Sequence, residues 1–216
     1  MFDQVNKSLL QIIDFSPDEL RLFDQQFQLR HAPKKFNILK AGNQCDFEIF
    51  LIKGCVRMFC NNDSGDDLNL GFFAENSWVC DYDSYENLKP SLYTIETLEE
   101  CTYLVLNKEG KSLLCEANPK FKIAFKTFIV KYTIYLQNRL RVMMATNARN
   151  KYLDFLSFES DLLNRIPQYH IASYLGMSPE FLSKVRKKSL ITNNTEHTFS
   201  SILYQLHFIG EINLLE

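Results

Sequence analysis

The side chains with the clearest capacity for specific chemistry lie in one stretch, QYHIASYLGMSPEFLSKVRKK, which runs from Gln168 to Lys188. Ser183 and Lys184 follow Glu180 by three and four residues, so on a helix these side chains share one face. A lysine can donate to guanine O6 and N7, and a carboxylate can accept from cytosine N4. The basic residues that follow are better placed for phosphates, which position a protein without reading sequence. We therefore predict DNA contacts from Gln168, Ser178, Pro179, Glu180, Ser183, Lys184, Arg186, Lys187 and Lys188.

The same stretch carries the signals of two short helices joined by a tight turn. Gly176 can adopt the left-handed conformation that ends a helix. Ser178 is a good N-cap, and Pro179 suits the first position of the helix that follows. Small Ala172 allows another helix to approach closely. We expect five residues to face inward: Ile171, Ala172, Leu175, Leu182 and Val185. This pattern predicts a helix-turn-helix, and a helical hairpin with surface lysines is the alternative.

Charge is distributed unevenly along the chain. The 216 residues carry a net charge of only −2. From Arg139 to Lys188, nine basic residues stand against four acidic ones, which gives +5 and leaves −7 for the remainder. An asymmetry of this kind suggests an anionic partner for the C-terminal part.

The elements that must hold this stretch in place change character along the chain. Ser16 and Glu19 form a capping-box pattern with Pro17 between them, so a short helix should begin there and run to about Phe27. A further helix is expected before it, around Gln4 to Ile13. From Phe36 to Leu106, strand-length pieces alternate with turn signals every eight to twelve residues. This spacing predicts an all-β sandwich, barrel or roll.

A long helix should follow, reaching about Ala145. Its apolar residues recur every three or four positions in a narrow stripe, which is typical of a helix that pairs with a second copy. The alternative is a helix that packs on the β domain of its own chain. The predicted dimer stripe is Phe121, Phe125, Phe128, Tyr132, Leu136, Leu140 and Met143.

These signals divide the chain into four parts. We expect a sensor β roll with N-terminal helices over residues 1–116, a dimerisation helix over 117–146, and a helix-turn-helix domain over 147–190. Another helix should start this last domain near Asn147 and fade before Pro167. Residues 191–216 form an extension whose role the pattern does not define.

With these motifs in view, the chain resembles the Crp/Fnr family of transcription regulators over roughly residues 10–190. LKAGNQCDFEIFLIKGCVRMF is similar to the family's first strands, with Gly42 and Gly54 at its turn glycines. IASYLGMSPEFLSKVRKK is similar to the form common in short, Bacteroidetes-like members. The resemblance implies an α+β fold: a cyclic-nucleotide-binding-like β roll (a jelly roll), a long dimerisation helix and an all-α helix-turn-helix domain. It also implies a homodimer on an inverted-repeat operator in double-stranded DNA, with RNA polymerase as a further partner.

One segment departs from the family pattern. Members that bind cyclic nucleotides carry a Gly-Glu pair and, about ten residues later, an Arg followed by Ser or Thr. In WVCDYDSYENLKPSLYTIE, Cys80 and Asp81 stand at the first pair and Ser91 and Leu92 at the second. The guanidinium that would grip a phosphate is missing, so we expect no cyclic AMP binding and an unknown effector, if any. Pocket candidates from this position are Cys80, Asp81, Tyr82, Ser91, Leu92 and Tyr93; ordinary loop and strand residues are the alternative.

Other function classes find little support. The nucleophile-elbow, P-loop, zincin and dinucleotide-binding motifs do not occur, so we expect no enzyme activity. The six cysteines are scattered without a C-x-x-C pair, and the four histidines lack metal-ligand spacing. We expect no metal site, no membrane span and a cytoplasmic location with reduced thiols. A transcription regulator is the first hypothesis, and an effector-binding or protein-interaction module that does not bind DNA is the second.

Overall fold

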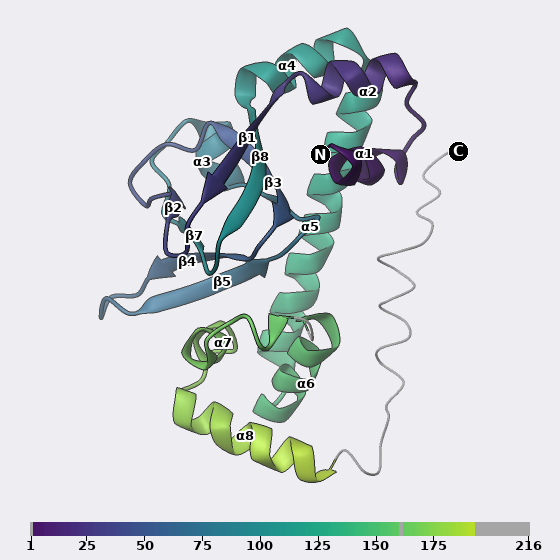
Figure 1. Cartoon of the computed structure of the whole chain (residues 1–216). Coiled ribbons are helices and arrows are strands. Elements are labelled where there is room, and N and C mark those ends of the chain that lie inside the picture. Colours follow the sequence, from purple (N-terminus) through teal and green to yellow (C-terminus); the bar gives the residue numbers. More distant parts are fainter. Residues whose placement is uncertain (1, 160–161, 193–216) are drawn as a thin grey trace.

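Two four-stranded antiparallel sheets form the core of the molecule, which we describe from a computed structural model covering residues 2–159 and 162–192 (Figure 1). The first sheet has the order β1 (Phe27–Ala32), β8 (Cys101–Asn107), β3 (Phe47–Lys53) and β6 (Trp78–Val79). The second has the order β2 (Asn37–Leu39), β7 (Thr94–Thr97), β4 (Val56–Asn61) and β5 (Asp67–Phe73). The prediction of a β roll is confirmed, and its first strand begins at Phe27 and not at Phe36.

Apolar side chains from both sheets meet between them. Ile49 and Leu51 on β3 and Val56 and Ile95 on the second sheet are fully buried in one cluster. The turn from β3 to β4 requires Gly54, which has φ +103°. A Cβ there would lie 2.5 Å from the Cys101 sulfur and 2.8 Å from the Glu100 carbonyl oxygen, so no side chain fits.

Helices cover the outer face of the first sheet. These are α1 (Asp3–Leu10), α2 (Pro17–Asp24), α4 (Lys108–Ala117) and the start of α5 (Pro119–Ala145). The predicted capping box is present: the Ser16 hydroxyl accepts from the Glu19 N–H at 3.3 Å, and the Glu19 carboxylate accepts from the Ser16 N–H at 2.6 Å. Phe23 and Phe121 stack on each other against buried Phe50. Helices α1 and α2 therefore belong to the same domain as the β roll.

The 27-residue helix α5 connects the roll to a helical unit, as Figure 1 shows. Asn118 caps it by accepting from the Lys120 N–H, and α4 ends beside this cap, close to the predicted limit of the sensor part. The helical unit consists of α6 (Ala148–Glu159), α7 (Gln168–Tyr174) and α8 (Pro179–Thr192). The helix-turn-helix prediction and the α+β class are confirmed.

The roll and the helical unit share a third apolar cluster. Phe72 of β5 packs on Tyr174 with ring centroids 5.2 Å apart, and Phe155 of α6 lies 5.6 Å from the same tyrosine. Cys55 and Leu98 of the roll belong to this cluster. The two parts are thus docked side by side. The predicted extension over residues 191–216 falls almost wholly outside the described residues. Among the residues that the structure describes, no helix is long and apolar enough to cross a membrane.

Candidate nucleic-acid interface

The turn between α7 and α8 is built as its sequence predicts. Gly176 has φ +67°, and its N–H donates to the Ser173 carbonyl at 3.1 Å. The Met177 N–H donates to the Ala172 carbonyl at 3.0 Å. This pair of bonds is the Schellman motif, which satisfies the last carbonyls of a helix and favours glycine.

Helix α8 begins with the expected cap. The Ser178 hydroxyl accepts from the Phe181 N–H at 3.2 Å. Leu182 and Val185 are buried against the apolar side of α7 and α6. Hydrogen bonds from its own backbone N–H and from Ser178 lower the pKa of Glu180, which therefore carries its charge at the start of the helix.

The structure places the predicted DNA-contacting residues on the surface. Ser183 and Arg186 are half-buried, and the other members of the set are exposed: Gln168, Ser178, Pro179, Glu180, Lys184, Lys187 and Lys188. Burying the inner face of α8 turns these outer side chains toward solvent. We call the residues from Pro179 to Lys188 on this face the α8 ridge.

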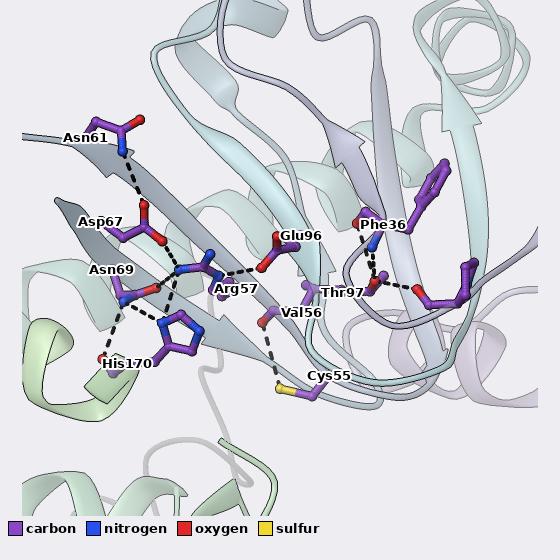
Figure 2. A network of polar contacts seen from close by, with 11 residues as sticks. Phe36, Cys55, Val56, Arg57, Asn61, Asp67, Asn69, Glu96, Thr97 and His170 are labelled. Atoms are coloured by element: carbon purple, nitrogen blue, oxygen red, sulfur yellow. Dashed lines mark hydrogen bonds and ion pairs between the residues drawn. The ribbon is translucent and has the colours of Figure 1, made fainter. Parts of the chain in front are cut away.

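His170 differs from its expected place. In the first helix of a helix-turn-helix we expect a polar side chain to face solvent or a DNA phosphate, but His170 is only 5% exposed. Its Nδ1 lies 3.1 Å from Arg57 Nη1, and Asn69 Nδ2 donates to its carbonyl at 3.4 Å (Figure 2). Burial and the charge of Arg57 lower the pKa of His170 to about 4, with Asp67 opposing the shift. This side of α7 faces the roll and is closed to DNA.

Arg57 is the centre of the polar network in Figure 2. It lies on β4, is 5% exposed, and donates to Glu96 at 2.8 Å and to Asp67 at 2.7 Å. The Asn69 side chain accepts a further bond at 3.3 Å. A buried guanidinium requires such partners because an unpaired charge there would cost several kcal/mol. The network therefore fixes the β4–β5 hairpin and α7 relative to each other.

Two more polar side chains of the helical unit, Ser173 and Arg165, bond to the roll. The Ser173 hydroxyl donates to the Asp67 carbonyl at 2.5 Å and accepts from the Asn69 N–H at 3.1 Å. Arg165 donates to both oxygens of Glu75 at 2.9 Å and also contacts Glu99. Sequence reasoning missed all of these residues, because their partners lie far apart along the chain.

The segment around Asp81 and Ser91, which departs from the family pattern and which we call the cassette, bonds to itself. The Ser91 hydroxyl donates to the Asp81 carboxylate at 2.6 Å, and the same carboxylate caps α3 (Tyr82–Asn87) by accepting from Asp83 and Ser84. Cys80 is buried at 4% exposure, whereas Leu92 is 68% exposed. Tyr82 and Tyr93 are half-buried. Thus Asp81 and Ser91 meet, and Ser91 brings a neutral hydroxyl to the position where the family pattern has an Arg.

The predicted dimer stripe splits into two halves. Phe121 and Phe125 are 0% and 4% exposed and belong to the core with α2, so no second copy can cover them. Phe128 and Tyr132 are half-buried and pack on Trp78 and Phe73 of the same chain. Met143 is half-buried beside the turn at Gly176. Leu136 and Leu140, in contrast, are exposed at 38% and 60%.

The residues that make α5 apolar on its open side were only partly identified from the sequence. Ile129, Val130 and Met144 are exposed at 36%, 37% and 79%, and they extend the line through Leu136 and Leu140. We call these five residues the open stripe. Periodicity alone did not separate it from the face that covers the roll, because both recur every three or four residues.

Cysteine and histidine residues form no metal site in the parts of the chain that the structure describes. Within residues 2–159 and 162–192, no group of three or more His, Cys, Asp or Glu side chains could hold an ion. None of the six cysteines, all within these ranges, forms a disulfide; four are buried and two half-buried.

Comparison with known proteins links this architecture to a fold. No protein-family model matches the chain, and no curated protein matches it. FixK2 from Bradyrhizobium japonicum is 12% identical with a TM-score of 0.68, covering 86% of this chain and 98% of FixK2. CLP from Xanthomonas campestris, a c-di-GMP-responsive global regulator, is 17% identical with a TM-score of 0.64, covering 86% and 97%.

A third solved structure carries the family name. This protein from Eubacterium rectale, assigned to the Crp/Fnr family of transcriptional regulators, is 14% identical with a TM-score of 0.62, covering 82% of this chain and 85% of its own. Identities this low establish the fold alone. The chain therefore has the fold of the Crp/Fnr regulators, as its resemblance in sequence predicted.

Proposed function

We propose that the chain is a DNA-binding transcription regulator that inserts α8 into the major groove. The observation that supports this most directly is the α8 ridge. The opposite face of α8 is anchored by Leu182, which is fully buried, while Glu180 and Lys184 on the ridge are exposed. A helix supported in this way presents its N-terminal residues to base edges.

Phosphate binding is assigned to the end of the same helix. Arg186, Lys187 and Lys188 follow Lys184 and give the ridge positive charge in a chain that is acidic overall. Such contacts supply most of the non-specific affinity and make it dependent on salt. In this proposal Lys184 reads a base and Lys188 binds a phosphate.

A homodimer is part of the proposal. The open stripe on α5 occupies positions 129, 130, 136, 140 and 144, and all five are large apolar side chains. Leu140 and Met144 expose most of their surface, which is costly for a helix in water. Pairing of two such helices would place the two copies of α8 about 34 Å apart, matching an inverted repeat. By family resemblance RNA polymerase is a further partner.

Cyclic AMP is not the proposed effector. Ser91 stands where binding members carry an Arg, and its hydroxyl is bonded to Asp81, so this position lacks the guanidinium that would grip a phosphate. The role of the roll is instead to hold or release α7 through the Arg57 network.

The test is a DNA-binding measurement at two salt concentrations, using fluorescence anisotropy on genomic fragments. We expect specific binding that weakens steeply with salt. Lys184→Ala should cost about 1–3 kcal/mol at one base position. Lys188→Ala should weaken all sequences alike and lower the salt slope by about one. Absence of binding at low salt, with a dimer present, would support an interaction module instead.

A further inference from the structure

A half-open cavity of about 270 Å³ lies between the β5–β6 connection, α3 and α5. Phe72, Phe73 and Trp78 come from the roll, and Tyr82 from α3. The lining residues are Phe72, Phe73, Asn76, Ser77, Trp78, Tyr82, Phe128, Lys131, Tyr132 and Tyr135. Of the six pocket candidates predicted from the sequence, all within the described residues, only Tyr82 lines this cavity.

The walls of this cavity are aromatic. Seven of the ten lining side chains carry rings, so the cavity favours a flat apolar ligand that can stack. Trp78 and Phe128 are stacked with centroids 5.2 Å apart, and Tyr132 lies 5.9 Å from Tyr82. Burial raises the pKa of Tyr132 to about 12, so its hydroxyl stays protonated and able to donate.

Charge narrows the class of ligand. Among the described residues that line the cavity, Lys131 alone is charged. Its side chain is half-buried on α5, where an ammonium group favours an anion and disfavours a cation. Asn76 and Ser77 add hydrogen-bonding groups to the lining. The volume suits a molecule of one or two rings.

The cavity wall also contacts the helix-turn-helix. The Tyr135 hydroxyl lies 2.9 Å from the hydroxyl of Tyr174 on α7. Phe72 packs on the same tyrosine at 5.2 Å. Arg139 covers the Tyr174 ring at 4.0 Å and donates to its carbonyl at 3.2 Å. A ligand that moves Tyr135 or Phe72 therefore acts directly on the docking of α7.

We propose that this cavity binds a small flat aromatic carboxylate, with its ring among Trp78, Phe128 and Tyr132 and its acid group at Lys131. We further infer that occupancy changes how α7 is docked and thereby the DNA affinity; this second part rests on the proposed function. Neither Asp81 nor Ser91 is among the residues that line this cavity.

The only tryptophan of the chain, Trp78, reports directly on the cavity. The probes are 4-nitrobenzoate, a non-fluorescent quencher, and its neutral partner 4-nitrobenzamide. We expect saturable quenching of the full-length protein by the benzoate and weaker binding of the amide. Lys131→Met should weaken benzoate binding about fivefold, in line with a partly exposed ion pair, and leave the amide unchanged. Lys126→Met, an exposed lysine of the same helix outside the lining, is the matched control.

The outcomes separate the two proposals. Unsaturable quenching by both probes, or an equal effect of Lys131→Met and Lys126→Met, overturns the ligand site. DNA affinity is then measured with and without saturating 4-nitrobenzoate, and a change of at least about threefold is expected. Probe binding with unchanged DNA affinity refutes the regulatory part. Loss of DNA binding under every condition refutes the proposed function and leaves the ligand site standing.

Discussion

Acid should loosen the contact between the roll and the helical unit through His170. In the folded chain its pKa is held at about 4 by burial and by Arg57, whereas an unfolded histidine titrates near about 6.5. The folded state therefore keeps His170 neutral while the unfolded state takes up a proton first. Stability contributed by this group is complete above the unfolded value and falls as the pH drops from about 6.5 toward about 4.

The size of the effect follows from these two pKa values. Between about pH 8 and about pH 5, linkage gives a loss of about 2 kcal/mol in the free energy of unfolding. This is an upper bound, because local opening of α7 would admit water to the ring. The groups facing it are Arg57 of β4 and Asp67 and Asn69 of β5, and none of them supplies an acid partner in direct contact with the ring.

Urea unfolding at the two pH values measures the effect. His170→Gln removes the titrating group while keeping a side chain that can accept from Arg57, so the wild type should lose about 2 kcal/mol more than this variant. His31→Gln is the matched control, because His31 is exposed on β1, away from α7. Equal losses for the wild type and His170→Gln would refute the reasoning.

Three other changes test different parts of the structure. Gly176→Ala forces a side chain into φ +67° and should lower the free energy of unfolding in urea by about 1–2 kcal/mol. Gly176→Asn should lower it less. Equal losses for the two variants would contradict the assigned turn. Leu140→Glu should convert the dimer to a monomer in analytical ultracentrifugation, because it places a charge in the open stripe. Lys122→Glu, an exposed position on the same helix, should leave the dimer intact. A monomeric wild type would disprove pairing through the open stripe. Calorimetry with cyclic AMP should show no binding, since Ser91, bonded to Asp81, stands where binding members carry an Arg. Micromolar affinity would contradict this reasoning.

Much of the architecture follows from patterns within a few residues. Ser16 and Glu19 define the start of α2, and Gly176 with Ser178 defines the turn before α8. These features depend on backbone groups one helical turn away, so the sequence alone specifies them. The alternation of short apolar runs also predicts the roll, because each strand must bury one face.

The sequence predicted only part of the candidate site. The α8 ridge could be identified because its side chains share a helix and its apolar partners are nearby. The burial of His170 could not, because Arg57 is 113 positions away. Likewise, the stripe on α5 reads as one pattern, but Phe121 meets α2 and Leu140 does not.

The amino-acid sequence thus determined the helices, the strands and the basic face of α8, since these arise from local backbone preferences and side-chain spacing. Only the tertiary structure decided which polar groups are buried together. It brought Asp81 to Ser91, and it placed Tyr135 of α5 against Tyr174 of α7. A buried polar group is stable only with a partner, and which partner it meets depends on how distant segments pack.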